Sequence, residues 1–176
     1  MYLFFIFAFM QIVNAQDFCK QIKKESSPDG YNLNFISPYS EKVLPAVRAT
    51  RNVDFNPEND GYDNFFVIFR IVGGPVDDIF TKGADGTTVE KKEKTMMVEF
   101  DDKTVISTDT VQINHDLTDD KADVIRTLFF PITDDNIKDF STKKIVRFRL
   151  AGYEKKFPKD SANAVMNYIK CIKAAR

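Results

Sequence analysis

The sequence predicts a mainly β (α+β) fold, an antiparallel sheet or sandwich with a short helix and a C-terminal helix packed on it. Three observations predict this class. Short stretches rich in aromatic and β-branched residues recur along the chain at strand-like length. They follow one another without long helical patterns between them, which favours antiparallel pairing. Near the C-terminus, Ala162, Val165 and Ile169 recur at helical spacing, which predicts an amphipathic helix over about 160–175.

The first fifteen residues have the composition of a secretory signal peptide. Residues 2–13 are almost entirely apolar, and short side chains occupy the positions that signal peptidase recognises before a cut after Ala15. A signal peptide normally begins with positively charged residues, and this region contains no Lys or Arg. An uncleaved anchor and a buried N-terminal helix are therefore the alternatives. We therefore expect 1–15 to be a signal peptide and 16–176 to form a single β-rich domain.

Cleavage at this site would export the protein to the periplasm or the extracellular medium. Because Cys19 does not directly follow the cut, we expect no lipid anchor, and no later segment has the length and apolarity of a membrane span. The charge is balanced, with 25 Lys and Arg against 26 Asp and Glu, which argues against nucleic acid as a partner. We expect a monomer or a weak oligomer.

The two cysteines lie near opposite ends of the chain, at Cys19 and Cys171. An even number of cysteines in an exported chain favours a disulfide, which would tie the N-terminus to the last helix. Two buried free thiols are the alternative. A catalytic cysteine is disfavoured because there is no Cys-x-x-Cys motif and His115 is the only histidine that could serve as its base.

The longest apolar stretch after the N-terminus is Phe65–Val72, and glycines and a proline end it. Alternate residues would point to opposite faces, and both faces are largely apolar, which predicts a central strand covered on both sides. Earlier in the chain, 16–25 suits either a helical turn or an edge strand. The other predicted strands are 31–35, 46–53, 95–100, 104–108, 109–114, 124–132 and 143–150.

The last predicted strand has two different faces. Val146, Phe148 and Leu150 would share the apolar face, and the face with Ile145, Arg147 and Arg149 would be hydrated or ion-paired. Each predicted helix has capping candidates. Thr133 would cap the short helix, with Ile137 and Phe140 as its apolar contacts, and Asp160 or Ser161 would cap the C-terminal helix.

Several motifs of this chain resemble those of small exported β-rich proteins of Bacteroidota, a group without an established activity. The matching segments, which span nearly the whole mature chain, are Asp17–Lys20, Pro45–Arg48, Asn64–Arg70, Lys143–Leu150 and Tyr168–Cys171. All of them are structural motifs. The resemblance therefore implies the bacterial envelope and a terminal cysteine pair, and it implies no function.

Residues with chemical potential are few, and none is assigned as catalytic. A lone histidine such as His115 is most often a surface residue. Hard oxygen ligands on a loop suit Ca²⁺, and four carboxylates lie within eight residues, at Asp116, Asp119, Asp120 and Asp123. This spacing matches no known calcium loop, and solvated acidic turns are the simpler explanation.

The function that we expect from these observations is a non-enzymatic exported binding or interaction domain of the bacterial envelope, without a cofactor. One alternative is a hydrolase that uses carboxylates on loops, because the separation of such a pair depends on the fold. Another alternative is a calcium-dependent envelope protein. The sequence names no ligand for any of the three.

Overall fold

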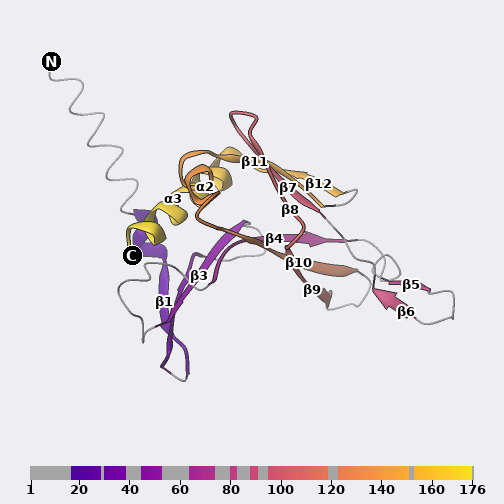
Figure 1. Ribbon diagram of the computed structural model, residues 1–176, viewed down its shortest axis with the longest axis horizontal. Coiled ribbons are helices and arrows are strands. Elements are labelled where there is room, and N and C mark those ends of the chain that lie inside the picture. Colours follow the sequence, from indigo (N-terminus) through magenta and orange to yellow (C-terminus); the bar gives the residue numbers. More distant parts are fainter. Residues whose placement is uncertain are drawn as a thin grey trace, which may run out of the picture.

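A computed structural model shows a molecule built from two main layers (Figure 1). It describes residues 17–28, 30–38, 45–52, 64–73, 80–82, 88–90, 95–118, 123–150 and 153–175. The predicted signal peptide lies outside the described residues, so its cleavage stays a prediction. Within the described part of the chain, no helix is both long and apolar enough to cross a membrane.

The first layer is a six-stranded antiparallel sheet, here called the large sheet. Its strands, in spatial order, are β1 (Lys23–Ser26), β2 (Asn32–Ile36), β3 (Ala46–Asn52), β4 (Asn64–Val72), β10 (Val124–Pro131) and β9 (Gln112–Leu117). The chain therefore builds β1 to β4 as a meander and returns later to add β10 beside β4 and β9 beside β10. This topology places the apolar strand β4 in the interior of the sheet, as predicted.

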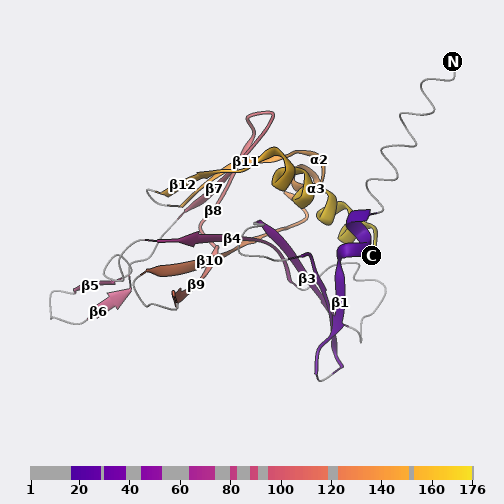
Figure 2. The ribbon, with the colours of Figure 1, turned by 180° about the vertical axis from the view of Figure 1, so that it is seen from behind.

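The second layer is a four-stranded antiparallel sheet, here called the small sheet. Its strands, in order, are β12 (Tyr153–Lys156), β11 (Ile145–Leu150), β7 (Met96–Phe100) and β8 (Val105–Thr108). A separate pair, β5 (Phe80–Lys82) and β6 (Thr88–Glu90), lies away from both sheets (Figures 1 and 2). The mainly β, antiparallel class predicted from the sequence is confirmed.

An aromatic cluster joins the two layers. Phe69 of β4 contacts Phe148 of β11 at 4.8 Å between ring centroids, and Phe157 packs against both rings. On the α2 side, the ring of Phe140 lies 5.1 Å from that of Phe100 and packs against β10 as well. Most of the phenylalanines among the described residues therefore lie in the core or pack against it.

The two faces of β4 are buried to different degrees. Phe65, Val67 and Phe69 lie in the core between the layers. On the opposite face, Ile68 belongs to a second, small cluster, and Val72 is 55% exposed. The prediction of an interior strand is therefore confirmed, whereas burial on both faces holds only along part of its length.

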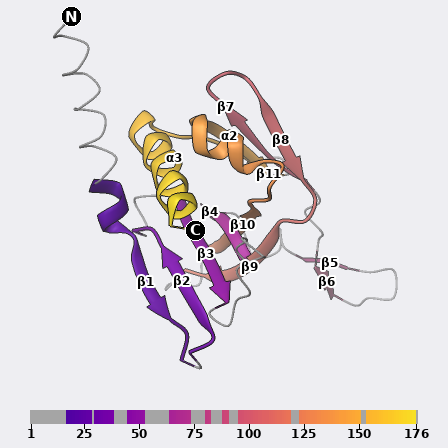
Figure 3. The same cartoon turned by 60° about the vertical axis from the view of Figure 1, so that its left-hand side comes forward.

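The C-terminal helix α3 (Lys159–Ala174) packs on β3, β11 and α2 (Figure 3). Its predicted apolar stripe is confirmed, because Ala162, Val165, Ile169 and Ile172 are all buried. The predicted caps are wrong. The helix begins directly after Pro158, whose carbonyl accepts a hydrogen bond from the backbone N–H of Ala162, four residues along, so Asp160 and Ser161 already lie in the first turn.

The short helix α2 (Ile137–Thr142) also begins differently from the prediction. Asn136, and not Thr133, occupies the N-cap position. The amide of Asn136 folds back over the preceding turn: its Oδ1 accepts a hydrogen bond from the Thr133 backbone N–H, and its Nδ2 donates to the Pro131 carbonyl. The predicted apolar contacts, Ile137 and Phe140, are buried as expected.

The two ends of the described chain are joined. Residues 17–21 are helical and lead into β1, so the N-terminal stretch contains both a helical turn and an edge strand. The predicted disulfide links Cys19 to Cys171. Around it, the Phe18 ring packs edge-on against Tyr168 at 5.4 Å, and the Tyr168 hydroxyl donates a hydrogen bond to Gln21 Oε1 at 2.7 Å.

A bulge in β11 changes which of its side chains face the core. Ile145 pairs with Phe100 and Arg147 pairs with Glu99, so Val146 is an additional residue opposite β7. Consequently Ile145 is buried, although the regular alternation placed it with the arginines, and Val146 is only half-buried. The assignment of these two residues from the sequence was therefore wrong, and that of Phe148 and Arg149 was right.

Candidate functional site

The outer face of the small sheet, directed away from the core, carries the largest connected group of ion pairs among the described residues. In the register of the four strands, two rows of side chains cross this face: Lys156, Arg147, Glu99 and Val105 in one row, and Glu154, Arg149, Met97 and Ser107 in the other. Opposite charges are direct neighbours at Arg147–Glu99 and at Arg149–Glu154, whereas Lys156 stands beside the like-charged Arg147. Such cross-strand pairs favour this pairing of the strands.

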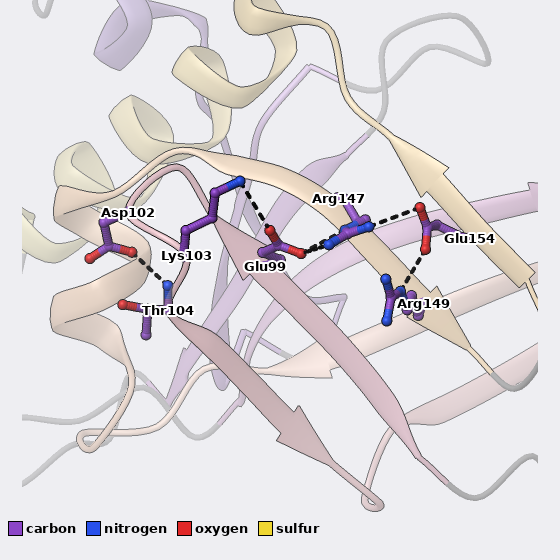
Figure 4. A network of polar contacts seen from close by, with 7 residues as sticks. All are labelled: Glu99, Asp102, Lys103, Thr104, Arg147, Arg149 and Glu154. Atoms are coloured by element: carbon purple, nitrogen blue, oxygen red, sulfur yellow. Dashed lines mark hydrogen bonds and ion pairs between the residues drawn. The ribbon is translucent and has the colours of Figure 1, made fainter.

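The centre of this face is the guanidinium of Arg147 (Figure 4). Its Nε donates a hydrogen bond to Glu99 Oε2 at 2.6 Å, and its Nη2 donates to the same oxygen. Its Nη1 donates to Glu154 Oε1 at 3.1 Å, and Arg149 Nε donates to the other oxygen of Glu154 at 2.6 Å. Lys103 Nζ adds an ion pair to Glu99 Oε1 at 3.7 Å. We call these five residues the charged network.

The charged network stays ionised over a wide pH range. The hydrogen bond from Arg147 is the largest of the effects that lower the pKa of Glu99, and the same guanidinium leads the lowering of the pKa of Glu154. In return, the hydrogen bonds to Glu99 and then Glu154 raise the pKa of Arg147. Each charge therefore fixes the charge of its neighbour, as expected for opposite charges in contact.

A second group of charges fixes the end of this face. Lys143 Nζ forms ion pairs of 2.8 Å with both Asp102 and Asp139, and it donates a hydrogen bond to Thr104 Oγ1 at 2.8 Å. The backbone N–H of Thr104 also donates to Asp102 Oδ1 at 2.9 Å. The hydrogen bond from Lys143, followed by those from Thr104, lowers the pKa of Asp102 to about 2. Helix α2 is thereby attached to the β7–β8 turn.

A shallow hollow of about 330 Å³ lies beside the charged network. It is lined by Glu99, Asp101, Lys103, Val146, Arg147 and Lys156. The bulge that turns Val146 outward therefore supplies part of its wall. The hydrogen-bonding capacity of the lining is uneven: Glu99 accepts from Arg147 and pairs with Lys103, whereas the ammonium of Lys103 is 83% exposed and makes one long ion pair. Asp101 adds one carboxylate, whose Oδ1 accepts the Lys144 backbone N–H at 3.2 Å. The hydrogen-bonding capacity that remains is therefore mainly that of the Lys103 and Lys156 donors.

The calcium candidates chosen from the sequence are only partly described. Asp119 and Asp120 lie outside the described residues. Asp116 lies on β9 opposite Ile125, where its Oδ1 accepts the Leu117 backbone N–H at 2.9 Å. Asp123 closes the neck of the loop through backbone hydrogen bonds with Thr118. Among the described residues, no group of three or more His, Cys, Asp and Glu side chains is placed to hold a metal ion.

His115, which we expect at the surface from the sequence, lies on the edge strand β9 of the large sheet. It is half-buried on β9, directly opposite Arg126 of β10, and Arg126 is 7% exposed. Arg126 Nη1 donates a hydrogen bond to the Gly73 carbonyl at 3.3 Å, which ties the end of β10 to the end of β4. This contact serves the packing of the strand ends.

The charged network was only partly visible in the sequence. The alternation of Arg147 and Arg149 predicted a hydrated or ion-paired face, but Glu99 is 48 residues away from Arg147 and was not singled out. Strand β12, which supplies Glu154, was missed. A signal was present, since the glycine at position 152 is a turn residue between the strand with the two arginines and a second short stretch with an aromatic residue at each end.

Comparisons with protein-family models, with curated proteins and with solved structures give no match for this chain. The resemblance to exported proteins of Bacteroidota stays a prediction.

Proposed function

We propose that this protein is an exported, non-enzymatic binding domain of the bacterial envelope that recognises carboxylate groups on the outer face of its small sheet. The observation that carries the proposal is the charged network together with the adjoining hollow. Its carboxylates are already engaged by arginine, while ammonium groups at the rim retain free donor capacity. A ligand that brings its own carboxylates would fill that capacity.

Lysine and arginine would contribute differently to such binding. The guanidinium of Arg147 is held by two glutamates, so it forms a fixed floor for the hollow. Lys103 and Lys156 are exposed and stand on flexible side chains at the rim, where they can turn toward a bound carboxylate. The bulged Val146 offers an apolar contact beside them. Binding through exposed charges of this kind is weak and sensitive to salt.

The acid–base properties of the network support binding over hydrolysis. A carboxylate hydrolase needs one acid whose pKa is raised, so that it can donate a proton. The pKa values of Glu99 and Glu154 are instead lowered, chiefly by hydrogen bonds from arginine. The hydrolase therefore receives no support from this site. The calcium alternative depends on Asp119 and Asp120, and it stays a prediction to be tested by a thermal shift on addition of Ca²⁺.

Export is supported by the predicted signal peptide and by the disulfide between Cys19 and Cys171. Its test is the intact mass of the protein recovered from the envelope of an expressing bacterium, before and after reduction and alkylation. A mass that begins at Gln16, with both thiols labelled only after reduction, is the expected result. A retained N-terminus or a lipid-sized increment would contradict the proposal of a soluble exported domain.

Carboxylate binding is tested with poly-L-glutamate as the probe, followed by NMR chemical shifts at low salt. We expect chemical-shift changes at the rim of the hollow. The double variant Lys103→Ala, Lys156→Ala should lose about 1 kcal/mol of binding free energy, which corresponds to at least a fivefold loss of affinity. The matched control, Lys159→Ala with Lys170→Ala, removes the same charge from exposed positions on α3. Equal losses in both double variants would show non-specific attraction and would overturn the site.

A further inference from the structure

The four edges of the two main sheets are protected to very different extents. Charged side chains on an edge strand discourage pairing with another strand. Three of the edges have them: β1 carries Lys23, Lys24 and Glu25, β12 carries Glu154, Lys155 and Lys156, and β9 carries Asp116. Strand β8 carries none, because its sequence is Val-Ile-Ser-Thr. Val105, at its start, is 52% exposed.

The backbone of β8 presents free hydrogen-bonding groups at this edge. In the β7–β8 hairpin, the Phe100 N–H donates to the Thr104 carbonyl at 2.9 Å. Hydrogen-bonded pairs alternate along an antiparallel ladder, so Ile106 and Thr108 bond to β7, and the N–H and C=O groups of Val105 and Ser107 point away from it. Among the described strands, none lies beside β8 on that side (Figure 3).

We propose that β8 pairs with β8 of a second copy of this chain, antiparallel and around a two-fold axis through Ile106. Two conditions apply to antiparallel pairing. Residues that stand opposite each other must lie on the same face of the sheet, and the N–H and C=O groups that point away from β7 must meet those of the partner strand. The register that places Ile106 opposite the partner's Ile106 meets both conditions, because Val105 then exchanges backbone hydrogen bonds with the partner's Ser107. The two small sheets would become one continuous eight-stranded sheet.

Charge complementarity selects a second copy as the occupant. The same register brings Lys103, which precedes β8, opposite the partner's Asp109, which follows it. By symmetry each pair forms twice, as required for an isologous interface. Lys103 and Asp109 are both exposed, so neither has to be uncovered before the copies meet. A neutral strand flanked by opposite charges at its two ends is therefore complementary to itself.

The interface is small, and the dimer is expected to be weak. A pair of four-residue strands buries less than the roughly 1,000 Å² that a stable interface needs. Formation of the dimer should therefore depend on concentration over the range from about 10 μM to about 1 mM. The hollow lies on the sheet face and the proposed contact lies on its edge, and Lys103 belongs to both. Positions 105 and 107 lie outside the lining of the hollow, so variants there test the dimer separately from carboxylate binding.

Sedimentation velocity over this concentration range tests the proposal with Ser107→Pro. Proline removes the outward N–H of residue 107 and leaves the bonds between β7 and β8 intact. We expect the wild type and the control Ser107→Ala to dimerise, and Ser107→Pro to remain a monomer. Should Ser107→Pro unfold by circular dichroism, Val105→Lys replaces it, since it puts a charge on an exposed edge position. A wild type that stays monomeric, or an edge variant that still dimerises, overturns the proposal.

A charge exchange tests the register itself. Lys103→Asp or Asp109→Lys alone would place like charges opposite each other and should weaken the dimer at least tenfold. The double variant restores opposite charges and should recover the dissociation constant to within about threefold of the wild type. Aspartate suits position 103, where φ is +72°. A double variant that is as weak as the single ones contradicts the proposed register.

Discussion

The two faces of strand β11 are built on different principles. On the inner face, Phe148 is 1% exposed and packs against the rings of Phe69 from the large sheet and Phe157, which follows β12. On the outer face, Arg147 and Arg149 meet Glu99 and Glu154 at the solvent boundary. Burial of a large apolar side chain contributes several kcal/mol to stability, whereas an ion pair near solvent contributes little.

This difference assigns the two faces different roles. The inner face holds the two sheets together, so substitutions there should lower stability. The outer face arranges charges in a fixed pattern at small cost in stability, so it is free to bind. The predictions below test this division, beginning with the largest expected effect.

The largest effect is expected from Phe148→Ala. Removal of this ring takes away its contacts with Phe69 and Phe157 and leaves a cavity between the sheets, which should lower the free energy of unfolding by about 3–5 kcal/mol. Urea denaturation measures the loss. The control is Met97→Ala on the outer face of the same sheet, where the side chain is 41% exposed and the loss should stay below about 1 kcal/mol. Similar losses in both variants would contradict the division.

The second effect concerns the disulfide, which supports the packing of α3 on the inner face of the large sheet. The double variant Cys19→Ser, Cys171→Ala removes this disulfide, which links two residues separated by 152 positions in the sequence. Because this link restricts the unfolded chain, its loss should cost about 2–5 kcal/mol and increase the denaturant dependence of unfolding. Chemical denaturation without reductant measures both values. An unchanged midpoint would show that the aromatic and hydrogen-bonded contacts hold the ends without it.

A smaller effect is expected from Tyr168→Phe, at the same junction. The ring would keep its contact with Phe18, while the hydrogen bond to Gln21 would be lost, at a cost of about 1 kcal/mol. Comparison of this variant in the wild-type and disulfide-free backgrounds measures whether the two links act together. A larger loss without the disulfide would show that they do, and equal losses would show independent contributions.

The sequence predicted the inner face well and the outer face poorly, for physical reasons. Apolar alternation and helical spacing are local, so Phe69, Phe148 and the stripe of α3 could be assigned to the core without knowledge of the topology. The disulfide could also be predicted from the sequence, because two cysteines allow only one pairing. Contacts of the charged network depend on which strands are neighbours. The sequence of β7, β11 or β12 alone does not show which strand lies beside it.

Two errors at the ends of regular alternation show the limit of local patterns. The bulge at Val146 reversed the expected orientation of Ile145, since one additional residue exchanges the faces. At the start of α2, Asn136 took the position predicted for Thr133, because its amide satisfies two groups of the preceding turn. The first error lies on the outer face, where the bulged Val146 lines the hollow.

The smallest effect is the pH dependence of stability, and it belongs to the outer face. The pKa of Asp102 falls from 3.8 to about 2 in the folded protein, because Lys143 and Thr104 bond to its ionised form. A carboxyl group whose pKa is lowered by folding stabilises the protein above the unfolded pKa, and this contribution is lost as the pH falls through the folded value. The loss for Asp102 should therefore occur between about pH 4 and about pH 2.

Asp102→Asn removes this contribution. The variant should be less stable than the wild type at neutral pH, and the two should converge as the pH approaches about 2. Urea midpoints measured from pH 7 downward test this, with Asp135→Asn as the control, because Asp135 is an exposed carboxylate outside the contact with Lys143. A constant difference between Asp102→Asn and the wild type at every pH would indicate that the carboxylate acts through the geometry of the turn. In that case the outer face would contribute to the fold by shape, and its charges would be available entirely for binding.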